Sequence, residues 1–332
     1  MKTHRREFLK IGLGMGSAVS LGAPRCTGSS LLQATDDLLS KVVIARDEGL
    51  RSAREGLDQA RLIQVLDCAM QSFYDRDNPL EAWRMVAKPG QVVGLKVNCL
   101  AGKGISTSTQ LVEAVSQRLQ QVGIRGSDII IWDRLNRDLE RCGFSVRETG
   151  PGPRCFGNDH LGFGPQLQIQ NAVGSLVCKT LTEVCDLVIN LPVLKDHGIT
   201  GMTMAMKNLF GAIHNPNKYH LDTGDPYVAD VYMLPPIRSK VKLTICDAVT
   251  AQYEGGPSYM PQWTWPFNGL IVGTDPVALD FTGWRILEEK RDQIGMLSLK
   301  RVGREPTYIA TAADSQHQLG TNRSDRIEVM EV

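Results

Sequence analysis

Two apolar runs flanking an amphipathic helix constrain the fold of this chain more than any other feature. Residues 91–97 (QVVGLKV) and 128–132 (DIIIW) are almost continuously apolar, as expected for strands buried on both faces. The segment between them carries apolar residues at helical spacing, namely Leu111, Val112, Val115, Leu119 and Val122. A strand, a helix and a second strand in this order predict parallel strands joined by a right-handed crossover.

The same alternation continues along the chain. Further apolar strands are predicted at residues 42–45, 185–191, 241–246 and 270–273, and further helices at 57–73 and 275–289. The pattern predicts an α/β fold, with a mostly parallel open sheet flanked by helices. Long irregular insertions are expected at residues 134–174, which are rich in glycine and proline, and at residues 250–267. We expect residues 31–332 to form a single domain of this class.

The first thirty residues predict an export signal. Arg5 and Arg6 precede Phe8, Leu9 and Lys10, and a short apolar, glycine-rich run follows. This arrangement resembles a twin-arginine signal peptide, although no cleavage site is well formed. It predicts an exported, periplasmic protein that meets the twin-arginine translocation machinery during export. Signals of this type serve proteins that are exported already folded, often around a cofactor.

Charge and hydropathy exclude two kinds of partner. The predicted signal holds five basic residues and one acidic residue, so its removal changes the formal net charge from +1 to −3. A mildly acidic chain lacks the basic footprint of nucleic-acid and anionic-membrane binding. No later run of apolar residues is long enough to predict a stable membrane span. The sequence therefore favours a small-molecule ligand.

The cysteines disfavour an iron–sulfur cluster. Seven of the eight lie beyond Cys26, and none of them forms CxxC or a ferredoxin-type run. Several lie in apolar stretches, where cysteine usually acts as a small buried hydrophobe. A disulfide pair cannot be assigned from their spacing.

Polar side chains recur where the predicted strands end. Lys96 and Asn98 close one strand, and Lys195 and His197 follow another. Asp247 ends the predicted strand at residues 241–246. Open α/β sheets place their ligand sites outside the carboxyl ends of parallel strands. These residues therefore predict one polar cleft at a single edge of the sheet.

Lysines and a glycine-rich loop predict an anionic ligand for that cleft. Residues 98–106 lie between a strand and a helix, where backbone N–H groups can face an anion. The loop matches neither GxxxxGK[ST] nor GxGxxG, so no nucleotide is predicted. Lys96, Lys103, Lys195 and Lys207 would supply positive charge to a phosphate or carboxylate.

Three histidines lie close together in residues 191–220, and two interpretations stay open. His197, His214 and His220 can contribute imidazole ligands to a divalent metal, or can transfer protons near neutral pH. Their spacing matches no rigid metal motif. We predict Asp247 or Glu254 as the acidic partner that completes the metal shell or orients a histidine. Trp263 and Trp265, in the segment 250–267, either cover a ligand or pack that loop onto the domain.

Separated motifs in the chain resemble a known family. They are KVN at 96–98, LPVLKDH at 191–197, GMTMAMKNLFG at 201–211 with the following His220, ICDAVTAQYEGGP at 245–257 and GTDPVALD at 273–280. In this order they resemble the domain of unknown function family 362 from about residue 40 to residue 330. Asn208 in the segment 191–220 and Asp275 at the end of the strand at 270–273 are candidate ligand-binding residues; the resemblance implies an active or binding site at these motifs and adds Asp280. Some relatives carry a ferredoxin-type module, which this chain lacks.

The sequence thus supports two hypotheses. The first is an exported enzyme with a polar cleft, performing redox or hydrolytic chemistry on an anionic substrate. The candidate catalytic residues are His197, His220, Lys195 and Lys207; the candidate ligand-binding residues are Lys96, Asn98, Lys103, Asn208, Asp275 and Asp280; and the candidate metal ligands are His197, His220, Asp247 and Glu254. The second hypothesis is a non-catalytic periplasmic protein that captures an anion or a metal.

Overall fold

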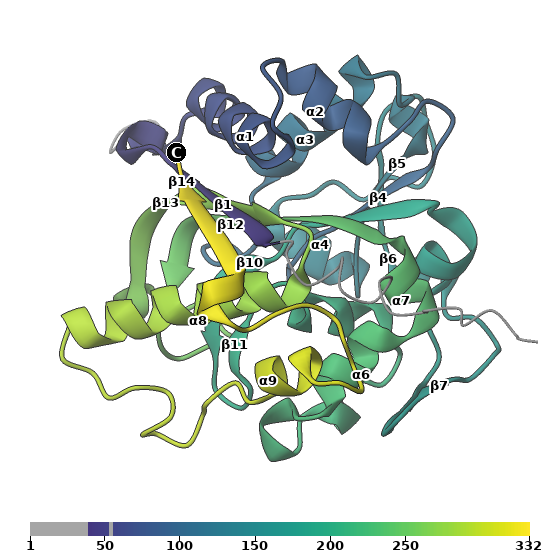
Figure 1. Ribbon diagram of the computed structural model, residues 1–332. Coiled ribbons are helices and arrows are strands. Elements are labelled where there is room, and N and C mark those ends of the chain that lie inside the picture. Colours follow the sequence, from purple (N-terminus) through teal and green to yellow (C-terminus); the bar gives the residue numbers. More distant parts are fainter. Residues whose placement is uncertain (1–38, 53–55) are drawn as a thin grey trace, which may run out of the picture. The chain divides into compact units, whose positions relative to one another are not determined.

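A mixed sheet with mostly parallel strands forms the centre of the protein (Figure 1). The computed structural model describes residues 39–52 and 56–332; the export signal predicted at residues 1–30 lies outside them. The main path of the sheet comprises, in spatial order, β14 (Ile327–Glu331), β1 (Ser40–Arg46), β13 (Thr264–Gly273), β12 (Val241–Gln252), β9 (Leu187–Asn190), β4 (Val93–Lys96), β5 (Ile129–Asp133) and β6 (Arg154–Gly157). The predicted α/β class, with helices flanking a mostly parallel sheet, is confirmed.

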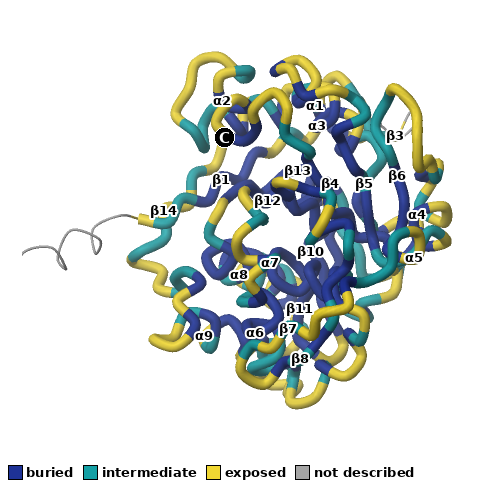
Figure 2. Tube along the Cα trace, turned by 90° about the vertical axis from the view of Figure 1, so that its right-hand side faces the viewer, coloured by how far each residue is buried: buried dark blue, intermediate teal, exposed yellow. Residues whose placement is uncertain are grey.

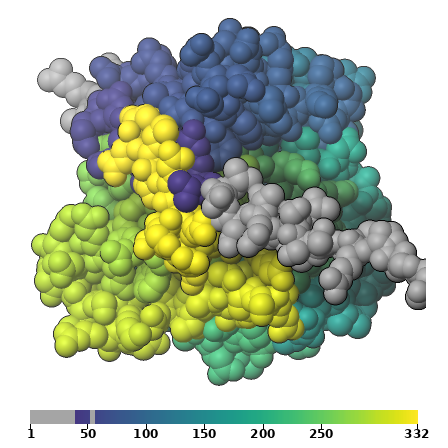
Figure 3. All heavy atoms as spheres, viewed as in Figure 1, coloured from purple at the N-terminus to yellow at the C-terminus, as the bar shows by residue number. Residues whose placement is uncertain are grey.

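One strand of this path breaks the parallel arrangement. β12, β9, β4, β5 and β6 are all parallel to their neighbours in that series, as the strand–helix–strand pattern predicted. β13 runs antiparallel to both β1 and β12. β14 pairs with β1 in parallel, so the C-terminal residues lie against the first described strand (Figure 3).

Two further strands branch from the path near the ends of β9 and β12. β10 (Val193–His197) follows β9 closely and pairs in parallel with β12, and β11 (Gly201–Thr203) folds back antiparallel onto β10. The pairing brings Lys195 opposite Gln252 and Thr203. The segment 191–220, which holds three histidines, therefore begins as ordered sheet.

Helices cover both faces of the sheet, and each face has its own core. The first layer is α1 (Gln59–Tyr74), α2 (Pro79–Val86) and α3 (Thr109–Gln121); the second includes α6 (Tyr227–Met233), α7 (Pro235–Lys240), α8 (Pro276–Gln293) and α9 (Tyr308–Ala313). Alternate residues of a strand point to opposite faces. Val43 and Ala45 accordingly join the core under the first layer, and Val42 and Ile44 join the other. Burial is highest along these strands (Figure 2).

The insertions contain more structure than the sequence predicted. Residues 134–174 hold α4 (Asn136–Cys142), β6, α5 (Asn158–Leu161), β7 (Gln168–Gln170) and the start of β8 (Val173–Ser175), and smaller strands β2 (Arg51–Ser52) and β3 (Gly56–Leu57) follow β1. Residues 250–267 are largely a hairpin, because β12 continues to Gln252 and β13 begins at Thr264. Trp265 packs edge-on against Phe267 within β13. In the described residues, no helix is both long and apolar enough to cross a membrane.

Candidate functional site

A cavity of about 640 Å³ opens at the carboxyl ends of the parallel strands. Lys96 is the last residue of β4, Asp133 is the last residue of β5, and His197 is the last residue of β10. All three line the cavity. The location agrees with the rule that open α/β sheets bind ligands outside their strand ends. The cavity also receives side chains from residues 207–220, which follow β11.

Lys96 and Lys195 are the most deeply buried lysines of the cavity lining, and their hydrogen-bond partners differ in charge. Lys96 donates to Asp133 Oδ1 at 2.8 Å, and this ion pair is almost fully buried. Lys195 is 1% exposed and donates to Asn98 Oδ1 at 3.1 Å and to the Ile105 carbonyl at 3.3 Å. Lys96 therefore has a carboxylate partner, whereas the hydrogen-bond acceptors of Lys195 are neutral.

A chain of amides connects these lysines to the second wall of the cavity. Asn98 donates through Nδ2 to Asn208 Oδ1 at 3.0 Å, and Asn208 donates through Nδ2 to Asn190 Oδ1 at 2.7 Å. Asn190 in turn donates to the Ala205 carbonyl at 2.9 Å. Each amide is buried and satisfied, so the network fixes the orientation of Asn98 and Asn208.

Lys207 and His220 form a hydrogen-bonded pair on that second wall. Lys207 Nζ lies 2.8 Å from His220 Nε2, and His220 Nδ1 lies 3.0 Å from the Pro216 carbonyl. A carbonyl only accepts, so Nδ1 carries the proton and Nε2 accepts from the lysine. Lys207 also lies 3.7 Å from the centre of the Phe210 ring, which favours its ammonium form.

His197 is fixed in the opposite tautomer. Its Nδ1 accepts hydrogen bonds from the backbone N–H groups of Ile199 and Thr200, both at 3.2 Å. The neutral ring must therefore carry its proton on Nε2. The rings of His197 and His220 are stacked, with centres 5.5 Å apart and planes 24° apart. The cavity thus holds one imidazole N–H donor next to an imidazole that accepts from an amine.

Burial shifts the protonation equilibria of these groups towards their neutral forms. It lowers the pKa of Lys195 to about 8 and that of Lys207 to about 7. Burial, assisted by the nearby charge of Lys207, lowers the pKa of His197 to about 2 and that of His220 to about 4. Both histidines are consequently neutral at physiological pH, while the lysines titrate close to it.

A carboxylate on α8 positions the turn that carries Lys207 and Asn208. Asp280 is fully buried and accepts from the backbone N–H groups of Ala205 at 2.6 Å and Met206 at 3.2 Å. The resemblance implied a ligand-binding role for Asp280. The structure instead places its carboxylate against the backbone that precedes Lys207, where both oxygens are occupied.

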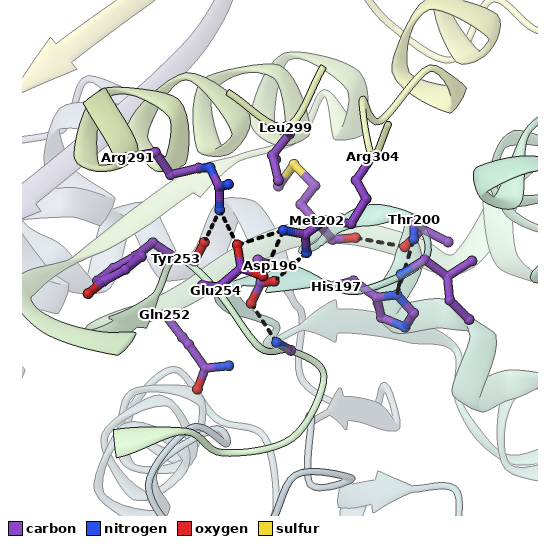
Figure 4. A network of polar contacts seen from close by, with 12 residues as sticks. Asp196, His197, Thr200, Met202, Gln252, Tyr253, Glu254, Arg291, Leu299 and Arg304 are labelled. Carbon is purple, nitrogen blue, oxygen red and sulfur yellow. Dashed lines mark hydrogen bonds and ion pairs between the residues drawn. The ribbon is translucent and has the colours of Figure 1, made fainter. Parts of the chain in front are cut away.

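An ion-pair network supports the third wall of the cavity (Figure 4). Glu254 pairs with Arg291 at 2.5 Å and with Arg304 at 2.6 Å, and Arg304 also pairs with Asp196 at 3.1 Å. Asp196 Oδ1 accepts from the N–H of Gly256 at 2.7 Å, and Gly256 lines the cavity. Glu254, predicted as a metal ligand, therefore neutralises two arginines and fixes the loop after β12.

The remaining predicted residues lie outside the main cavity. Lys103 is exposed and lines a separate cavity of about 280 Å³ together with Asp247. Asp247 Oδ2 accepts from the N–H and the hydroxyl of Ser108, the residue that caps α3. Asp275 caps α8 by accepting from the N–H groups of Val277 and Ala278.

The structure thus unites seven predicted residues around one cavity. They are Lys96, Asn98, Lys195, His197, Lys207, Asn208 and His220. Within the described part of the chain, no group of three or more His, Cys, Asp and Glu side chains is arranged to hold a metal ion. Asp247 and Glu254 were predicted to partner the histidines. Asp247 instead accepts hydrogen bonds from Ser108 at the N-terminus of α3, and Glu254 forms ion pairs with two arginines.

Sequence reasoning missed two contributors to the site and one pairing. Asp133 follows the apolar run DIIIW and was visible as a polar strand end, but its ion pair with Lys96 was not predicted. Asn190 is the last residue of the buried strand β9, where its polarity was the available signal. Phe210 resembles any core aromatic in the sequence, and only its position under Lys207 reveals a role.

These features define an α/β protein with a buried cationic cavity at the carboxyl edge of its sheet. Residues 93–285, more than half of the chain, match the family described as Domain of unknown function (DUF362). The chain belongs to this family, as its motifs indicated.

In comparisons with individual proteins, the chain spans only part of the length of the proteins that it matches. A thylakoid-associated protein of Synechocystis sp. (strain ATCC 27184 / PCC 6803 / Kazusa) is 34% identical over 129 residues, which span 37% of this chain and 39% of that protein. A solved protein structure from Thermotoga maritima is 10% identical with a TM-score of 0.43, covering 71% of this chain and 59% of that one. The lactate racemase apoprotein of Thermoanaerobacterium thermosaccharolyticum is 8% identical with a TM-score of 0.43, covering 76% and 58%.

Proposed function

We propose that this protein is an exported enzyme that binds a small anionic substrate and transfers protons to or from it. The observation that carries the proposal is the pair Lys195 and Lys207. Both amino groups are buried and face the cavity, and within residues 39–52 and 56–332 neither forms an ion pair. Export rests on the twin-arginine pattern at Arg5 and Arg6.

A buried ammonium group without a counter-charge is costly, and a bound anion offsets that cost. Removing a charge from water into a protein interior costs several kcal/mol after relaxation. Lys96 avoids the problem through Asp133, but Lys195 and Lys207 contact neutral acceptors. A carboxylate or phosphate between them would supply the missing charge and draw both lysines into their protonated forms.

The proton-transfer part of the proposal rests on the tautomers and pKa values of the same groups. Lys207 has a pKa of about 7, so it gives up or takes a proton readily at neutral pH. His220 Nε2 accepts from it, and His197 offers an N–H donor to a developing negative charge. Hydrolytic and redox reactions both need such transfers.

The alternative is a non-catalytic periplasmic binding protein. The burial of Lys195 and Lys207 supports this alternative as well. Anion capture alone would explain their burial. The two proposals differ in what the histidines do, because a binding protein does not need the Lys207–His220 pair to exchange protons.

Sulfate and acetate binding, measured by calorimetry at pH 6.5, tests the anion site. Lys195→Met and Lys207→Met should each weaken binding by about tenfold or more, since each removes a charge-assisted hydrogen bond. Lys103→Met is the matched control, because Lys103 is exposed and lines the other cavity. Equal affinity in all four proteins would refute the anion site.

Turnover distinguishes the enzyme from the binding protein. Nitrophenyl esters, phosphomonoesters and redox dyes are tested with the wild-type protein and with His220→Gln, whose amide oxygen can still accept from Lys207. The enzyme proposal expects turnover that this variant loses while anion binding persists. Anion binding with no turnover on any of these probes would favour the binding protein.

A divalent metal at His197 and His220 is our second proposal for these histidines, motivated by their stacked rings. Among the described residues, no hydrogen bond occupies His197 Nε2, so this nitrogen is the ligand atom to test, and a metal bound there would displace the proton that Nε2 carries in the neutral ring. Metal analysis and an absorption spectrum of natively exported protein are the measurements. Stoichiometric metal that His197→Ala loses would support the proposal, and unchanged occupancy would overturn it.

A further inference from the structure

We propose that the substrate is an amphipathic anion, with its charged head bound at Lys195 and Lys207 and its apolar body lying along Leu100 and Ile199. This inference rests on the proposed function and specifies its substrate class. It follows from three features of the cavity: its size, the exposed aliphatic side chains in its lining and the separate segments that supply its apolar residues.

The cavity is too large for an inorganic anion alone. Its volume is about 640 Å³. A water molecule takes up about 30 Å³ of the liquid, so a phosphate or carboxylate group, equivalent to a few waters, leaves most of the cavity unfilled. Cavities of this size ordinarily accommodate a whole organic molecule.

The most buried cations of the lining and its exposed aliphatic side chains are different residues. Lys195 and Lys207 are 1% and 7% exposed, whereas Leu100 and Ile199 are 58% and 49% exposed, beside the polar and exposed Asn217. A single exposed leucine on a protein surface needs no explanation. Two large exposed aliphatic side chains in the lining of one cationic cavity do point to a ligand with an apolar part.

The rim is built from separate loops at the same sheet edge. Leu100 follows β4, Ile199 lies in the turn between β10 and β11, and Pro257 follows β12. Pro216, which is buried, opens η5 (Pro216–Tyr219), and His220 follows that turn directly. Because Leu100, Ile199 and Pro257 come from three segments that converge on one cavity, an anion that enters head first would place its tail among them.

A chain-length series tests the inference. Straight-chain carboxylates from acetate to decanoate are titrated at pH 6.5, below their micelle concentrations. Burying a methylene group contributes about 0.8 kcal/mol, or roughly a fourfold gain in affinity, so the Kd should fall by about two- to fourfold per methylene until the tail leaves the cavity. Octanol, which has the tail without the charge, should bind far more weakly than octanoate.

The matched variants locate the tail. The double variant Leu100→Ser and Ile199→Ser should keep the affinity for acetate and lose most of the dependence on chain length. Leu167→Ser is the control, because Leu167 is as exposed as Leu100, at 58%, but lies in the insertion before β7. It should leave the series unchanged.

The outcomes separate this inference from the proposed function. A flat series, with acetate binding that still depends on Lys195, would overturn the amphipathic substrate and leave the anion site standing. Absence of binding by every anion would overturn both. Octanol binding as tightly as octanoate, a length dependence that survives the double variant, or a dimer in sedimentation that the double variant dissociates would each overturn the placement of the tail.

Discussion

At the scale of single residues, the properties of the site depend on whether each buried lysine contacts a charged or a neutral partner. Lys96 has Asp133, while Lys195 and Lys207 have amide, carbonyl and imidazole partners. Burial therefore shifts the pKa values of the second and third lysines downwards and leaves them responsive to a ligand's charge. The same chemical group thus has a structural role at one position and a proposed functional role at two.

The pH dependence of anion binding follows from these pKa values. Acetate stays ionised from pH 6 to pH 9, whereas Lys207 and Lys195 lose their protons through about 7 and about 8. The binding-competent fraction falls with them, so affinity should drop by about tenfold or more over that range. Calorimetry in two buffers of different ionisation enthalpy should also show proton uptake on binding. Constant affinity with no proton uptake would contradict the prediction.

The buried histidine predicts how stability changes in acid. The unfolded state binds a proton on His197 below pH 6.5, whereas the folded state excludes it down to about pH 2. Stability should therefore fall as pH drops below 6.5, by about 2 kcal/mol at pH 5 from this residue. Urea denaturation of wild type and His197→Asn at pH 5 and pH 7 measures it. Asn keeps an acceptor near the Nδ1 position, so the variant should lose less stability in acid than wild type.

At the scale of elements, the second helical layer holds the backbone of the turn that carries Lys207. Asp280 extends from α8 to the N–H groups of residues 205 and 206, directly before Lys207. The turn there has few other means of satisfying these donors, and an unsatisfied buried N–H is expensive. The helix and the turn are therefore coupled through one side chain.

Replacing that carboxylate should destabilise the protein. Asp280→Asn turns one acceptor into an NH₂ group that faces a backbone N–H, so the free energy of unfolding should fall by about 2–4 kcal/mol. Glu289→Gln on the exposed side of α8 is the control and should change it by less than about 0.5 kcal/mol. Urea denaturation at pH 7 compares them. Equal stability of both variants would show that Asp280 does not support the turn.

At the scale of the whole molecule, distant segments converge on one cavity wall. Arg291 from α8 and Arg304 from the loop after it meet Glu254 from the segment after β12 and Asp196 from β10 (Figure 4). Arg291 is 1% exposed and also donates to the carbonyls of Leu297 and Tyr253. The network joins the loop that bears Gly256 to the sheet, which keeps that wall in place.

Neutralising the shared acid should weaken this assembly. Glu254→Gln leaves buried Arg291 without its carboxylate, so stability should fall by about 3 kcal/mol, as for other broken buried pairs. Glu305→Gln removes the partner of exposed Lys300 and should cost less than about 1 kcal/mol. Thermal and urea unfolding of the two variants provide the comparison. A similar small loss in both would contradict a supporting role for the network.

The sequence by itself determined the α/β class and the edge of the sheet that carries the site. Hydrophobic periodicity depends on local geometry, so strands and helices such as those at residues 91–132 are visible without the fold. Strand ends are likewise local, and Lys96, Lys195 and His197 follow from them. The sequence did not predict that β12 and β13 extend into a long hairpin. Glycine, proline and aromatic residues there interrupt the alternation of polar and apolar residues that indicates a strand.

Only the tertiary structure decided which polar residues face one another. Asp247 and Glu254 looked equivalent to the other strand-end groups, yet Ser108 and two arginines hold them outside the cavity. Asp280, predicted to bind a ligand, accepts hydrogen bonds from the backbone of the turn before Lys207. Such partners come from segments tens to hundreds of residues away, and pairing across that separation depends on how the layers pack. The local sequence pattern therefore predicts that a charged group lies at one edge of the sheet, whereas tertiary packing alone determines which opposite charge it contacts.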